Sequence, residues 1–81
     1  MIEQIRQVKA RYQTQLLKLA NVEGVGVGFK QINRQITDQL ALIVNVSRKV
    51  PLTQLAPDDV VPPHIDGVAT DVQEMGHFTP L

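Results

Sequence analysis

The sequence contains no cysteine and no tryptophan, and its only aromatic residues are Tyr12, Phe29 and Phe78. Without cysteine, a disulfide, a thiolate nucleophile and a cysteine-liganded metal are all excluded. Domains that bind nucleic acid usually combine a net basic balance with aromatic side chains that stack on bases. Because this chain has zero formal net charge at pH 7, we do not expect nucleic acid among its partners.

Long apolar runs are also missing. The longest, "LALIV" at 40–44, is far shorter than the roughly 20 residues that a membrane-spanning helix needs. Charged residues (Glu3, Arg6, Lys9 and Arg11) stand where a signal peptide would need an apolar core. We therefore expect no membrane partner, no secretion and a cytoplasmic location.

Residues that support catalysis are scarce. Ser47 is the one serine, and no G-x-S-x-G motif surrounds it. The two histidines, His64 and His77, lie on either side of Asp66, Asp71 and Glu74 in the sequence, but the spacing is not that of a familiar metal site. A solvated turn and strand edge explains this cluster better than a metal site. We predict that the chain is not an enzyme and holds neither cofactor nor metal.

The charges are unevenly distributed along the chain. Residues 1–49 contain all eight Lys and Arg and three acidic residues, which leaves +5, whereas residues 50–81 contain five acidic residues and no Lys or Arg. Such a split is matched either within one folded unit or by contacts between copies of the chain.

What is present indicates one small folded domain. The chain has 81 residues, of which 43% are hydrophobic, enough for a modest core. Apolar residues then recur at steps of three and four, which predicts a helix over about 2–20. The stripe consists of Ile2, Ile5, Val8, Tyr12, Leu16 and Leu19. Asn21, which tolerates a left-handed conformation, is a plausible stop for this helix.

The segment "EGVGVGFK" at 23–30 has glycine at every second position. Its spacing differs from the G-x-G-x-x-G of dinucleotide-binding turns, and a polar turn follows it rather than a helix. Alternation instead predicts a strand over about 22–31, with one face formed by Gly24, Gly26 and Gly28. We expect this bare face to allow close approach of a backbone, either that of the N-terminal helix or that of another chain.

Two further strands complete the predicted sheet. The segment at 39–48 is apolar on both faces, as a central strand is, and it pairs with the glycine strand through a turn at 31–38. A proline-rich connection follows at about 50–67, in which Pro57 can open one short helical turn. Asp66-Gly67 is a turn signal before a strand at about 68–75. The predicted fold is α+β, with one helix packed on a three-stranded, mostly antiparallel sheet in the order helix-strand-strand-strand.

Three segments carry a resemblance to a known family: "LANVEGVGVGFK", "LALIVNVSRKVP" and "VVPPHIDGVATDVQEMG". Their order, and the pattern P-x-x-I-D-G-V-x-T-D-V in the third, resemble the N-terminal region that precedes trypsin-like serine peptidase domains in bacterial proteins. The resemblance covers about residues 19–76. It implies a small α+β domain without catalytic residues of its own, present here either as a stand-alone relative or as an excised domain.

Two classes of function follow. The first is a non-catalytic interaction or regulatory module whose partner is a second copy of the chain or a trypsin-like peptidase domain. Its candidate contact residues are the three glycines and the apolar residues of the proline-rich connection, namely Leu52, Leu55 and Val61. The alternative is a small anion-binding or nucleotide-binding domain that uses the glycine face together with Lys30, Arg48 and Lys49.

Overall fold

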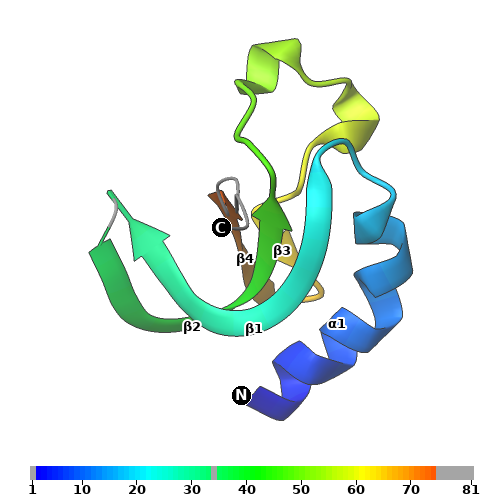
Figure 1. Cartoon of the computed structure of the whole chain (residues 1–81). Helices are drawn as coiled ribbons and strands as arrows, with labels where there is room; N and C mark the ends of the chain where they lie inside the picture. Colours follow the sequence, from blue (N-terminus) through cyan, green and yellow to red (C-terminus); the bar gives the residue numbers. More distant parts are fainter. Residues whose placement is uncertain (1, 34, 75–81) are drawn as a thin grey trace, which may run out of the picture.

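The computed structural model describes residues 2–33 and 35–74. A single helix lies on one face of a four-stranded sheet whose order is β1-β2-β4-β3, as Figure 1 shows. The elements are α1 (Ile2–Leu17), β1 (Val22–Ile32), β2 (Gln35–Val46), β3 (His64–Ile65) and β4 (Val68–Glu74), with two 3-10 helices, η1 (Leu52–Gln54) and η2 (Pro57–Asp59), before β3.

The helix forms where the apolar periodicity predicts it and buries the predicted stripe. Ile5, Val8 and Leu16 are buried, while Tyr12 and Leu19 are partly buried against the same core. The exception is Ile2, which is 45% exposed at the first helical position. The helix ends at Leu17, three residues before the predicted end, and a tight turn then leads into β1. Within that turn Asn21 adopts the predicted left-handed conformation, with φ of 66°.

Strands β1 and β2 form a long antiparallel hairpin. The predicted polar turn at 31–38 is wrong in extent, because both strands continue to the tip, where Gln35 pairs with Ile32. Strand β2 is central, as its two apolar faces predicted, since it lies between β1 and β4. The alternating residues Leu42, Val44 and Val46 face the helix and form the centre of the core.

The predicted number of three strands is wrong, because the sheet is mixed and has four strands, of which β1–β2 and β3–β4 are antiparallel pairs. Strand β4 runs parallel to β2, with Leu42 opposite Thr70 and Val46 opposite Glu74. The connection between β2 and β4 is long enough to cross the end of the sheet, which a parallel pair requires. The additional strand, β3, has only two residues and directly follows Pro62 and Pro63, so no alternation could reveal it.

A tight turn joins β3 to β4. Asp66 and Gly67 both have positive φ, 50° and 81°, which is the signature of a type I′ turn between antiparallel strands. Ile65 and Val68 pair on either side of it and are buried in the core. The turn predicted from the Asp-Gly pair is therefore confirmed.

Candidate functional site

The residues proposed from the sequence as contact residues lie in two separate places. Gly24, Gly26 and Gly28 lie on the face of β1 opposite the helix, because their neighbours such as Val25 pack into the helix-side core. Leu55 and Val61 instead line a cavity at one end of the sheet. The side chain of Leu52 lies outside what the structure describes.

The glycines line the inside of a sharp bend. Figure 1 shows β1 and β2 curving together into a U, with α1 outside one limb. The far limb returns toward β4, although β2 separates β1 from β4 in the sheet. The backbone N–H of Gln31 donates to Asp71 Oδ2 at 2.8 Å, and the side-chain amide of Gln73 donates to the carbonyl of Phe29 at 3.1 Å. These two contacts fix the curvature of the hairpin.

The bend explains the glycines better than an approaching helix does. Bending brings together the side chains of the inner face, and the crowding is greatest at Gly28, where an added Cβ atom would lie 3.1 Å from Cγ1 of Ile43, whereas Gly24 and Gly26 have no such close neighbour. A register shift between Phe29 and Gln31 adds a bulge at the same place, and bulges increase local bending. The expectation that the N-terminal helix packs on the glycines is wrong, because α1 lies on the opposite face.

The glycine face does not form a phosphate cradle. All three glycines pair with β2, opposite Asn45, Ile43 and Ala41, and the one glycine with positive φ in the described chain is Gly67. Loops that hold phosphate use successive backbone N–H groups in turn conformations, which a paired strand does not provide. Arg48 and Lys49 border the cavity instead, with none of the three glycines among its lining residues.

The cavity lies at the end of the sheet where β1 begins and β2 ends. It has a volume of about 250 Å³, and its apolar walls come from both the sheet and the proline-rich connection. They are formed by Val22, Val46, Leu55, Val61 and Val72. Residues 30 or more positions apart in sequence thus meet at one site.

Short hydrogen-bonded turns shape the connection that covers this cavity. The N–H of Gln54 donates to the Pro51 carbonyl at 2.8 Å, and that of Asp59 donates to the Ala56 carbonyl at 2.9 Å. The second turn is η2, the short helical turn that Pro57 predicted. Asp59 also accepts a hydrogen bond from the Ala20 N–H at 3.1 Å. The connection is therefore held to the turn after α1.

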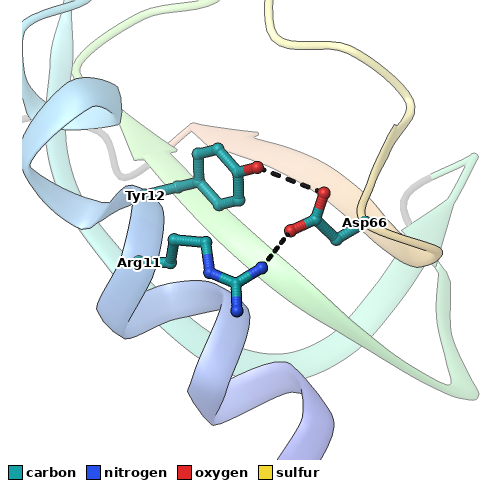
Figure 2. Close-up of polar contacts among 3 residues, drawn as sticks. All are labelled: Arg11, Tyr12 and Asp66. Atoms are coloured by element: carbon teal, nitrogen blue, oxygen red, sulfur yellow. Dashed lines mark hydrogen bonds and ion pairs between the residues drawn. The ribbon is translucent and has the colours of Figure 1, made fainter.

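A polar cluster holds the helix to the β3–β4 turn, and Figure 2 shows its three side chains. Arg11 Nη1 lies 2.8 Å from Asp66 Oδ2, and the Tyr12 hydroxyl donates to Asp66 Oδ1 at 3.1 Å. This ion pair joins the basic and acidic parts of the sequence, so at this point the charge split is matched within the fold.

The other polar residues of the "IDGVATDVQ" segment also form hydrogen bonds that hold elements of the fold together. The Thr70 hydroxyl donates to the Pro62 carbonyl at 2.5 Å, and the Thr70 N–H donates to the Pro63 carbonyl at 3.0 Å. Asp71 accepts from the backbone of β1, as described above. The segment that carries most of the family resemblance thus fixes the proline-rich connection, the helix and the hairpin relative to β4.

The geometry separates Ser47 from His64. Ser47 follows the end of β2, whereas His64 pairs with Ala69 near the start of β4, beside the Leu42 end of the β2–β4 ladder. About six residues of parallel strand lie between them, or roughly 20 Å along the sheet. A nucleophile and its base must lie within hydrogen-bond reach, so these two do not form a pair. His77 lies outside the described residues.

The described residues contain neither a metal-binding cluster nor a helix that could span a membrane. Within 2–33 and 35–74, no three His, Asp or Glu side chains are grouped so that they could hold a metal ion. The one α-helix described there is neither long enough nor apolar enough to cross a membrane.

The fold defines the class of the protein: a small α+β domain in which one helix packs on a four-stranded mixed sheet. The chain matches the family model of the NARROW LEAF 1 N-terminal domain over residues 2–73 and belongs to this family. NARROW LEAF 1 is a plant trypsin-like peptidase-related protein. The resemblance to an N-terminal region linked to such peptidases is thus confirmed, whereas its bacterial attribution is corrected. No curated protein matches the chain.

Proposed function

We propose that this domain is a non-catalytic interaction module that contacts a trypsin-like peptidase-related domain. One observation carries the proposal: the last strand ends beside an apolar cavity. Glu74, the last residue of β4, pairs with Val46, and both Val46 and Val72 line that cavity. Strand β4 therefore ends at the same end of the sheet as the cavity.

The polar residues of the domain support a structural role. Asp66, Thr70 and Asp71 are all engaged in contacts that hold the helix, the proline-rich connection and the hairpin. A site for general acid-base chemistry would instead present such groups to a substrate. The module acts by contact, either by stabilising the peptidase-related domain or by changing access to it.

The test is a binding experiment between this chain and a peptidase-related domain from a member of the family, produced separately. Isothermal titration calorimetry measures the association, and a thermal melt of the mixture measures the stabilisation. We expect saturable binding and a higher melting temperature of the peptidase-related domain. Two independent melts and no heat of binding would refute the proposed function.

Self-association is the second candidate, and the long edge strand β1 supports it. Unpaired N–H and C=O groups along an edge strand provide a template for another strand. The hairpin also exposes large apolar side chains: Val27 is 37% exposed, Phe29 49% and Ile36 70%. On the opposite side of the sheet, the two-residue β3 pairs with only Val68 and Ala69, so the rest of β4 forms a short edge there. A second copy of the chain would therefore pair along the longer edge, which is β1.

A further inference from the structure

The cavity at the end of the sheet has the size and polarity of a pocket for one large apolar side chain. Its volume is about 250 Å³, below the roughly 300–1,000 Å³ of pockets that enclose drug-sized ligands. An apolar cavity of about 150 Å³ already binds benzene. A leucine or phenylalanine side chain therefore fits, whereas a nucleotide or a large cofactor does not.

The walls of this cavity are preformed. Val46 is buried and belongs to β2, while Val22 and Val72 are half-buried on β1 and β4. The fourth wall, with Leu55 and Val61, belongs to the proline-rich connection, whose turns are held by the hydrogen bonds described above. Little ordering is needed on binding, and preorganisation of this kind increases affinity.

The rim of the cavity is positive. Arg48 and Lys49 are both exposed at the edge, and the structure records no ion pair for either among the described residues. The carboxylate at the rim, Asp59, already accepts the Ala20 N–H. Among the residues that line the cavity, two cations are thus present with one carboxylate, and this balance favours a ligand with a negative charge next to its apolar group.

We propose that this cavity binds a peptide segment in which one large apolar residue lies next to an acidic residue. The apolar side chain enters the space between Val46, Val61 and Val72, and the carboxylate meets Arg48 and Lys49. This inference rests on the proposed function, because it states what the module recognises on its partner.

Titration of the isotope-labelled chain with a short peptide, followed by NMR, tests the inference directly. The probe is acetyl-Gly-Ser-Phe-Glu-Gly-Ser-amide, with two matched peptides in which Ala replaces Phe or Lys replaces Glu. We expect saturable shift changes at Val22, Val46 and Val72 with the first peptide, and binding at least about tenfold weaker with each of the other two. Equal binding of all three peptides, no binding, or shifts confined to Phe29 and Ile36 would overturn the inference.

Three variants of the protein complete the test. Arg48→Glu/Lys49→Glu reverses the rim charge, and we expect it to weaken the probe about tenfold while leaving the fold intact. The control, Arg6→Glu/Lys9→Glu, makes the same change of charge in the first half of α1, away from the cavity, and retains binding. Val61→Phe fills the cavity from within, so its amide spectrum remains dispersed while the probe no longer binds. Unchanged binding by the rim variant or by the filled variant would contradict the site.

The peptide titration and the binding experiment with the peptidase-related domain distinguish failure of the site from failure of the proposed function. If the peptidase-related domain binds equally well to the wild-type chain and to Arg48→Glu/Lys49→Glu, the proposed function stands and the cavity is not its contact site. If the probe binds as expected but the peptidase-related domain does not, the site stands and the proposed function is wrong.

Discussion

Gly26 and Gly28 lie two residues apart on the same face of β1, but an added methyl group meets different surroundings at each. A Cβ atom at Gly26 has no heavy atom within 4 Å apart from its chain neighbours. A Cβ atom at Gly28 lies 3.1 Å from Cγ1 of Ile43, a buried side chain. Neither glycine has a positive φ, so the backbone accepts alanine at both. The two substitutions therefore isolate the effect of packing inside the bend.

The two substitutions are expected to differ in their effect on stability. Glycine in a strand interior is less stable than alanine by about 0.5–1 kcal/mol, so Gly26→Ala raises the free energy of unfolding by about that amount. In a domain of this size, 1 kcal/mol corresponds to about 4–8 °C in melting temperature, which gives an increase of about 2–8 °C. Gly28→Ala has the same entropic gain but must displace Ile43, and overpacking costs about 1–3 kcal/mol. With a gain of about 0.5–1 kcal/mol set against this cost, the net effect lies between neutral and about 2.5 kcal/mol destabilising.

Urea unfolding monitored by far-UV circular dichroism measures both variants at low protein concentration. A Gly28→Ala variant as stable as Gly26→Ala, or more stable, would refute the packing account of the bend. Gly26→Val extends the comparison to self-association. If a second chain packs on the glycine face, this variant lowers the mass measured by light scattering while the folded monomer persists. An unchanged mass would exclude Gly26 from any interface between copies.

Three further predictions concern the core, the polar cluster and the edge strand. Leu16→Ala removes a side chain that is 5% exposed and should cost about 2–5 kcal/mol in urea unfolding; a cost below about 1 kcal/mol would show that the stripe is not core. Asp66→Ala loses the contacts to Arg11 and Tyr12 and strains a residue at φ of 50°, at a cost of about 1–3 kcal/mol. Asp66→Asn, which tolerates this φ, should cost less, and equal losses in the two would rule out the backbone contribution. Phe29→Lys places a charge on the edge strand and should convert any dimer seen by sedimentation into monomer; a dimer that persists would place the interface elsewhere.

Local patterns in the sequence were sufficient to predict most of the individual helices, strands and turns. The three-and-four spacing from Ile5 to Leu16 defined the buried side of α1, because side chains on one helical face recur at that interval. Alternation defined β1 and β2, and Asp66-Gly67 defined the turn, because those residues favour positive φ. Each of these signals depends only on neighbours along the chain.

The tertiary structure alone decided the direction of β4, the bend of the hairpin and the cavity. The core side of β4 shows the same alternation whether the strand runs parallel or antiparallel to β2, so the sequence pattern does not predict the direction of the strand. The bend depends on Gln31 meeting Asp71, 40 residues apart in the sequence, and the cavity depends on Val22 meeting Val61. The glycine pattern was visible in the sequence, but its role was not. A bare strand face accommodates either an approaching backbone or a sharp bend, and only contacts between distant residues determine which of the two occurs.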